Sequence, residues 1–399
     1  MFRNVKFCIG LVIALAVILC GTLFMGARAR LFSEPVRMDV PAVTETPTEA
    51  PTEAPTEAPT QTPTEAPTEA PTEAPTEAPT EAPSEEATEP PTEAPEDPGT
   101  YTLTFGGNTT LGSSGAVYYA RYGFVMTMDQ NYDYPLANVR SLLEGDDFTM
   151  LSMEGALCDP GLPFRQENFA YRGPLEFAQI LSGSGVEAVS LANDHSHDYG
   201  ERGYESTLAG LEFQEIAYVE DAGTLLYTTD SGLTIGVVGI AFPDLTLNGL
   251  KDAVKTLREQ GAEIIVWSVH WGQENAAAPT QVQTQQAHAA IDAGVDIVFG
   301  SNPHRVQKVE YYGDGVILYS LGHFVFGADI YPDDLDGALV QVTVKRQGDG
   351  TVKVDTLNAV PLCLTSELFD DGRINFQPTP YEQGSEGYNR VMDKLGLSE

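Results

Sequence analysis

Apolar residues follow two periods from about Thr100 onward, and the two kinds of run alternate along the chain. Runs that are continuously apolar, or apolar at every second residue, are rich in β-branched side chains and predict strands. They cover residues 100–112, 148–157, 185–192, 233–242, 263–272, 295–304, 315–327 and 337–347. Runs with helical spacing cover residues 136–145, 174–185, 203–214 and 284–294. Alternating strands and helices predict an α/β fold in which helices cover sheets.

The globular pattern continues to about Val391. We therefore expect one domain over residues 100–391, followed by a short C-terminal tail over 392–399. The domain contains only two cysteines, Cys158 and Cys363. Two such residues in an exported protein either form a disulfide or pack as small buried side chains, and the second alternative is favoured.

The N-terminal residues 1–30 resemble a targeting segment. Arg3 and Lys6 precede about 20 apolar residues, which is long enough to span a bilayer. This length favours an uncleaved signal-anchor, although the small residues at 27–29 leave a cleaved signal peptide open. The positive charges before the apolar run favour a cytoplasmic N-terminus and an extracellular domain. We expect a protein of the cell membrane, or a secreted one if the segment is cleaved.

Residues 31–99 are expected to be a disordered linker, because the motif "PTEA" repeats there with proline at every fourth position. Proline at that spacing prevents a helix, and the segment offers no large apolar side chain to bury. An extended spacer is the favoured interpretation, with a glycosylated or wall-interacting stalk as alternatives. The formal net charge of the chain is -37, which argues against nucleic acid as a partner and disfavours polyanions at long range.

Polar side chains follow five of the predicted strands, each at the end of an apolar run. The carboxyl ends of such strands are where α/β proteins commonly bind ligands. If these ends converge, they form a pocket of oxygen and nitrogen donors suited to one or two ions of Mn, Zn, Fe or Mg. Two such ions could hold a phosphoester and activate water. The candidates are Asn108, Glu154, Asp194, His195, His270, Asn302 and His304.

Each candidate also has a structural alternative. Asn108 could be a turn residue, and His270 could simply pack beside Trp271. Asp194 or Asp198 could cap the helix that follows, and Asp198 is the favoured cap. Glu201, His197 and His288 show no pattern that indicates a site. It is the joint placement at successive strand ends that favours a pocket.

Six blocks of the sequence resemble CapA-type poly-γ-glutamate capsule proteins, which are similar to calcineurin-like metallophosphatases. The blocks lie in the same order over residues 101–327: "FGGNTTLG", "LSMEGALCD", "SLANDHSHDYGERG", "WSVHWG", "GVDIVFGSNPHRVQ" and "ILYSLGHFVFG". The resemblance implies a four-layer α/β/β/α sandwich, a dinuclear metal site at the strand ends, and a surface-anchored protein.

The match differs from the family pattern at four places. Asn108 stands where the family usually has Asp, Asp194 where it has Asn, Asn302 where it has His, and His323 where it has Asn. The first and third changes weaken the implied ligand set, because an amide binds a metal less strongly than a carboxylate or imidazole. The ligands that remain are sufficient for one ion, and His323 could substitute. They are Glu154, Asp194, His270 and His304.

The resemblance implies a cell-surface protein of poly-γ-glutamate capsule synthesis or export with a metal-dependent hydrolase site, which could be degenerate. In that site His195 would be the general acid. Expected partners are the polymer or a phosphoester substrate, the membrane, and membrane proteins of capsule synthesis. The main alternative is a non-catalytic module that binds polymer or cell wall and has lost its metals. A secreted phosphoesterase such as a nucleotidase is a third possibility.

Overall fold

The computed structural model describes residues 99–115, 117–158, 169–243 and 247–398. The expected membrane segment and nearly all of the expected linker lie outside these residues. Within the described ranges, no helix is both long and apolar enough to cross a membrane.

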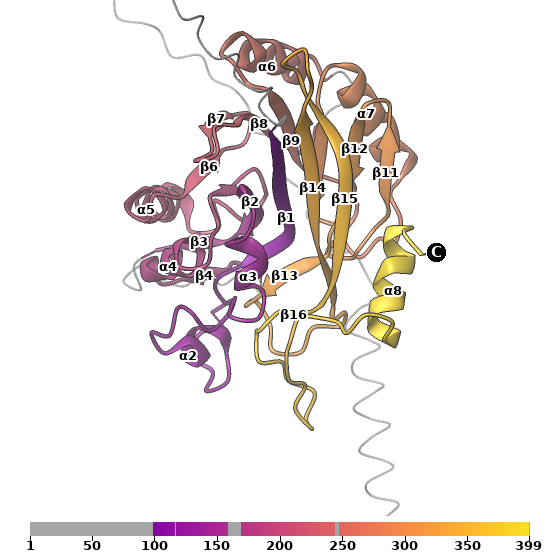
Figure 1. Cartoon of the computed structure of the whole chain (residues 1–399). Coiled ribbons are helices and arrows are strands. Elements are labelled where there is room, and N and C mark those ends of the chain that lie inside the picture. Colours follow the sequence, from indigo (N-terminus) through magenta and orange to yellow (C-terminus); the bar gives the residue numbers. More distant parts are fainter. Residues whose placement is uncertain (1–98, 116, 159–168, 244–246, 399) are drawn as a thin grey trace, which may run out of the picture. The chain divides into compact units, whose positions relative to one another are not determined.

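Two mixed sheets form the centre of the domain (Figure 1). In the first sheet, parallel strands at one side meet antiparallel strands at the other. Its order is β16 (Thr379–Pro380), β15 (Val352–Cys363), β14 (Asp336–Arg346), β1 (Thr100–Thr110), β2 (Phe148–Glu154), β5 (Ala188–Ser190) and β6 (Ala217–Val219), and β13 (His323–Phe326) also pairs with β1.

The second sheet has four parallel strands in its middle and antiparallel strands at both edges. Its order is β11 (Val309–Tyr312), β12 (Gly315–Leu318), β10 (Ile297–Ser301), β9 (Ile264–His270), β8 (Thr234–Ala241) and β7 (Thr224–Thr228). A separate two-stranded sheet pairs β3 (Ala156–Leu157) with β4 (Arg172–Gly173).

Apolar side chains from both large sheets share one core cluster, so the sheets pack against each other. Phe105 of β1 and Phe299 of β10 meet there, with ring centroids 5.2 Å apart. A second cluster joins the first sheet to a set of helices, and a third joins the second sheet to α6 (Asn248–Glu259) and α7 (Gln281–Asp292). The first set comprises α2 (Phe124–Met128), α3 (Arg140–Leu143), η1 (Leu175–Phe177), α4 (Ala178–Ser182) and α5 (Gly200–Phe213). The α/β prediction is confirmed.

The C-terminal helix α8 (Glu386–Leu395) crosses the boundary expected after Val391. Val391 and Leu395 are fully buried in the cluster between the sheets, which explains why the helix continues to Leu395. It ends at Gly396, whose φ of 71° is readily adopted only by glycine. The residues expected to be a tail therefore include the last turn of a packed helix.

The two domain cysteines follow the favoured alternative, which is packing without a disulfide. In the part of the chain that is described, no disulfide joins Cys158 to Cys363. Cys158 is buried beside Ala156 and Ala170, and Cys363 is half-buried at the end of β15.

Candidate functional site

A cavity of about 530 Å³ lies at the carboxyl end of β2 and beside the loops that follow β5 and β10. Because β1, β2 and β5 run parallel in one sheet and β9 and β10 run parallel in the other, their carboxyl ends reach common edges. The cavity is lined by Glu154, Phe169, Tyr171, Asp194, His195, Glu274, Asn275, His304, His323, Phe326 and Asp333. Four of the seven predicted site residues are in this lining: Glu154, Asp194, His195 and His304.

Asn108 supports the cavity from inside β1, next to irregularities in the register with both neighbouring strands. Its side-chain Nδ2 donates a hydrogen bond to Oε1 of Glu154, and its backbone N–H donates to the carbonyl of Gly322 at 2.9 Å. Gly107 is required here, because a Cβ would collide with the carbonyl oxygen of Gly322. The Oδ1 atom of Asn108 is buried without a hydrogen-bond partner. Asn108 is therefore a strand residue that contacts Glu154, and not a turn residue.

His270 ends β9 and is 1% exposed, and it reaches the cavity through Asp194. Its Nε2 lies 3.1 Å from Oδ1 of Asp194, while its Nδ1 lies 3.0 Å from Oγ of Ser301. The adjacent imidazole lowers the pKa of Asp194 to about 2, so this carboxylate is charged at neutral pH. The contact at Nε2 is an ion pair, and this atom makes no hydrogen bond with any described residue.

His195 forms a pair with Asp198, with 3.0 Å between Nδ1 and Oδ2. Burial opposes protonation of this ring, but the bond to Asp198 and the carboxylates of Glu154 and Asp194 raise the pKa of His195 to about 9. Asp198 also accepts a hydrogen bond from the backbone N–H of Tyr171 at 2.7 Å. The imidazole is thus held in place and protonated at neutral pH, as a proton donor requires.

The expected helix-capping role of Asp198 is wrong. Helix α5 begins at Gly200 after Tyr199, and the Tyr199 side chain makes no capping hydrogen bond. Turns occupy the residues between Asp194 and Tyr199, and Gly200 takes a φ of 64°, so the helix starts too late for Asp198 to reach its first N–H groups. The carboxylate instead orients the imidazole three residues before it.

His304 and His323 stack against each other at the cavity, with ring centroids 4.6 Å apart. Burial, together with the nearby His304 and Arg305, holds the pKa of His323 well below its usual value, so this ring is neutral. In each ring, Nδ1 is buried and lacks a hydrogen-bond partner. His323 entered the sequence analysis only as a possible substitute ligand, and it lines the cavity.

Asn302 has a different role from the other candidates. Its Nδ2 donates to the backbone carbonyls of Trp271 and Gly272, at 3.1 Å in each case. Its backbone takes a φ of 93°. The two hydrogen bonds connect the loop after β10 to the loop after β9. The side chain is 4% exposed and does not line the cavity.

Several cavity residues come from loops and were not predicted. Glu274 and Asn275 lie shortly after "HWG", and Phe169, Tyr171, Phe326 and Asp333 complete the lining. The carboxyl and amide groups immediately after the predicted strand end at His270 were the one available signal. The aromatic residues gave no such signal, because aromatic side chains are common in strands and loops that form no site.

The donor set fits a divalent ion in part. Asn108 and Glu154 form one pair, and Asp194 and His270 form another, and each pair includes a buried atom that lacks a hydrogen bond. Carboxylate and imidazole are suitable ligands for Mn or Zn. Among the residues that can be described, however, no group of three or more His, Cys, Asp or Glu side chains is arranged around one point.

The fold and cavity define a class: an α/β protein with a polar, histidine-containing pocket at its strand ends. Residues 102–328 match the family described as "Bacterial capsule synthesis protein PGA_cap", and the chain belongs to this family. A capsule biosynthesis protein CapA of Bacillus anthracis is 27% identical over 327 residues, which cover 74% of this chain and 77% of that protein. A PGA biosynthesis protein CapA of Bacillus subtilis is 31% identical over 209 residues, covering 46% and 53%.

Solved structures show a weaker likeness. The NAD nucleotidase of Haemophilus influenzae aligns with a TM-score of 0.36 and 11% identity, covering 75% of this chain and 63% of that protein.

Proposed function

We propose that this protein acts at the cell surface in the synthesis or export of a poly-γ-glutamate capsule. The observation that carries the proposal is that the cavity is built almost entirely from residues that match the family model. Ten of the eleven described residues that line the cavity lie within the residues 102–328 that match the capsule-synthesis family, and Asp333 is the exception. The N-terminal apolar segment, which would anchor the domain outside the cell beside membrane proteins of capsule synthesis, agrees with this role.

We further propose that the cavity is a metallophosphatase-like hydrolytic site in a four-layer sandwich. Glu154 with Asn108, and Asp194 with His270, would hold a divalent ion, with His304 at the facing wall. Such an ion, when bound, polarises the reacting ester or acyl group and makes water a better nucleophile. His195 would donate a proton to the leaving group, and Asp198 holds its ring for that transfer.

The charge of the cavity supports a role for the cation in substrate binding. Among the described residues, its lining includes the carboxylates of Glu154, Asp194, Glu274 and Asp333, and no Lys or Arg. A polyglutamate chain or a phosphoester would therefore be repelled by the cavity on its own. We expect Mn²⁺ to strengthen polymer binding and EDTA to weaken it. Polymer binding that EDTA leaves unchanged would contradict this part of the proposal.

Metal content and hydrolysis test the proposal directly. The full-length protein is reconstituted with Mn²⁺ or Zn²⁺, its bound metal is measured, and it is then assayed with a generic phosphodiester and with poly-γ-glutamate. We expect near-stoichiometric metal and metal-dependent hydrolysis of one of the two substrates. Clearly sub-stoichiometric metal and no hydrolysis of either substrate would exclude a metal-dependent hydrolase.

A non-catalytic polymer-binding module is the second candidate, and two observations favour it. The amide of Asn108 already donates to the carboxylate of Glu154, and no three acidic or imidazole side chains of the described residues surround one point. In that case the same assay would show polymer binding without turnover. Deletion of the gene would then reduce capsule, and a His195→Gln variant would restore it.

A further inference from the structure

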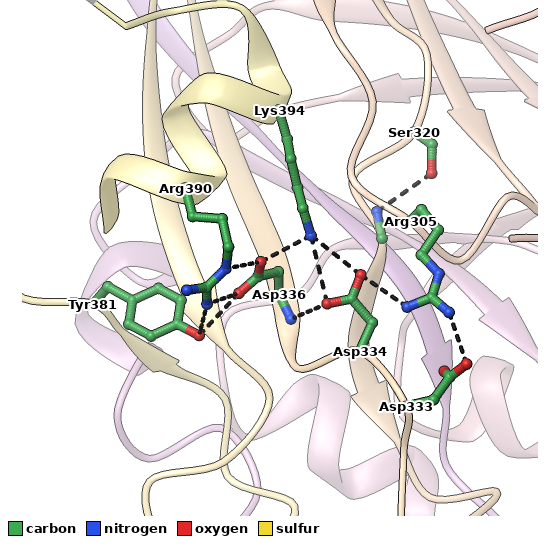
Figure 2. A network of polar contacts seen from close by, with 9 residues as sticks. Arg305, Ser320, Asp333, Asp334, Asp336, Tyr381, Arg390 and Lys394 are labelled. Carbon is green, nitrogen blue, oxygen red and sulfur yellow. Dashed lines mark hydrogen bonds and ion pairs between the residues drawn. The ribbon is translucent and has the colours of Figure 1, made fainter. Parts of the chain in front are cut away.

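A network of charged side chains connects the C-terminal helix to the cavity wall (Figure 2). Its centre is Asp336, the first residue of β14, which is 2% exposed. Arg390 of α8 donates two hydrogen bonds to this carboxylate, at 2.7 Å and 2.6 Å. Lys394, one turn further along α8, donates to it at 2.8 Å. Burial opposes ionisation, but these donors hold the pKa of Asp336 below its usual value.

A first connection runs through Asp336 to His323. The backbone of β14 meets the turn before β13 at the bridge between Gly322 and Gly337. Both glycines are required by close approach, since a Cβ on Gly337 would collide with the carbonyl of His323, and one on Gly322 would lie 2.9 Å from the carbonyl of Asp336. A shift of Asp336 must therefore move the backbone that carries His323.

A second connection runs through Asp334 to His304. Lys394 contacts Oδ2 of Asp334 at 3.2 Å, and the same oxygen lies 2.9 Å from the guanidinium of Arg305. Arg305 also binds Asp333, which lines the cavity, at 2.8 Å. Since Arg305 directly follows His304, the pairing fixes the loop that carries this histidine, whose own φ is 57°.

The geometry points to α8 as the element that positions the histidine pair of the cavity, with Lys394 as the shared donor of both connections. The two connections start at one ammonium group and end at two rings that stack on each other. The role falls on residues 333–394, which lie beyond the part of the chain that matches the family model. It goes beyond the proposed function, because it concerns the placement of the rings and holds whether or not the site is catalytic.

Histidine NMR tests this inference, because the chain has six histidines and their ring signals can be followed one by one. Full-length protein without metal is compared with its K394M and D334N variants at one pH. His304→Gln and His323→Gln variants assign the two signals. We expect both signals to shift toward the values of a solvated histidine in each variant, while the His288 signal, from a ring that stacks on Tyr312, stays in place.

The two variants change the charge in opposite directions, which separates displacement from a through-space field. Release of the rings shifts a signal the same way in both variants, whereas a field effect reverses its sign. The matched control is R258M, which breaks a 2.6 Å ion pair to Asp296 between α6 and the start of β10. Opposite shifts in K394M and D334N, or shifts no larger than those in R258M, would overturn the inference. Because D334N leaves the pairing of Arg390 with Asp336 intact, it remains informative if K394M fails to fold.

Discussion

The cavity and the charged network at α8 both gather ionisable side chains, but these side chains are paired differently in the two regions. In the network, the three carboxylates of Asp333, Asp334 and Asp336 face three cations, and each carboxylate has a partner within 3.2 Å. Among the described residues of the cavity, acidic groups outnumber cationic ones, and buried atoms of Asn108, His270, His304 and His323 lack hydrogen bonds. Buried polar groups are normally satisfied, so the network has the character of a structural element and the cavity that of a ligand site.

This comparison predicts opposite responses to substitution. A residue of the network should act first on stability and reach the cavity only through the histidines it positions, whereas a residue of the cavity should act first on ligand binding or chemistry. The first three predictions below test that contrast, and the last concerns two half-buried acids outside both regions.

The largest effect is expected at His195. The variant His195→Gln removes the proton donor and should reduce any hydrolysis of the assayed substrate by about 100- to 10,000-fold. The urea midpoint should change little, because a glutamine can still contact Asp198. A variant that unfolds more easily but retains its turnover would place His195 with the structural residues instead.

A large loss of stability is expected at Arg390. The variant Arg390→Met leaves the buried carboxylate of Asp336 with only Lys394 and Tyr381 as donors among the described side chains. The loss of the two charged hydrogen bonds should cost about 2 kcal/mol of unfolding free energy. Urea denaturation measures it. The control K353M breaks an exposed pair to Asp314, which should cost less than about 0.5 kcal/mol. Equal losses in the two variants would show that the network adds nothing beyond a surface pair.

A smaller effect, which depends on metal, is expected at Asn108. The variant Asn108→Asp places a second carboxylate beside Glu154 in a buried position, and should destabilise the metal-free protein by roughly 2 kcal/mol. Mn²⁺ should reverse this loss, because the variant offers two carboxylates to the ion. Thermal unfolding with and without Mn²⁺ measures both effects. If Mn²⁺ protects the variant no more than the wild type, Asn108 does not face an ion.

Much of the fold could be predicted because buried strands leave a simple signal. The runs ending at Glu154, His270 and Ser301 are continuously buried strands in the structure, as their apolar pattern indicated. Helix α6 was not predicted, although Leu250, Val254 and Leu257 have the i, i+4, i+7 spacing of an amphipathic helix. Helix α8 has the same amphipathic spacing and was likewise not predicted, so the expected domain boundary fell inside it.

The site could be predicted only as far as strand ends determine it. Glu154 ends a strand, and Asp194 and His195 follow one closely, so topology alone brings them to the cavity. Loop conformation decides the rest and leaves no periodic signal. The left-handed backbone of Asn302 turns its amide to backbone carbonyls, and the late start of α5 frees Asp198 to hold His195. Metal binding by the predicted ligands stays a prediction.

The smallest effect concerns two acidic groups away from the cavity, Asp146 and Glu187, which both bind Thr149. Burial raises the pKa of Asp146 to about 6 and that of Glu187 to about 7. A carboxyl whose pKa is raised on folding holds more protons in the folded state, so stability is highest below its unfolded pKa and is lost as pH rises through the folded value. Between pH 5 and about 8, these groups should lower the unfolding free energy.

The variant Glu187→Gln isolates this contribution, because a glutamine can accept the same hydrogen bond from the backbone of Thr149 without ionising. Urea midpoints of the two proteins are compared across this pH range. We expect the wild type to lose about 1 kcal/mol relative to the variant, since the side chain is partly exposed and solvent screens its charge. His195, whose raised pKa acts in the same direction, is present in both proteins and cancels in the difference. Parallel curves would mean that Glu187 titrates normally. In that case the contrast with the fully paired network would be limited to the cavity, and the acids beside Thr149 would not share it.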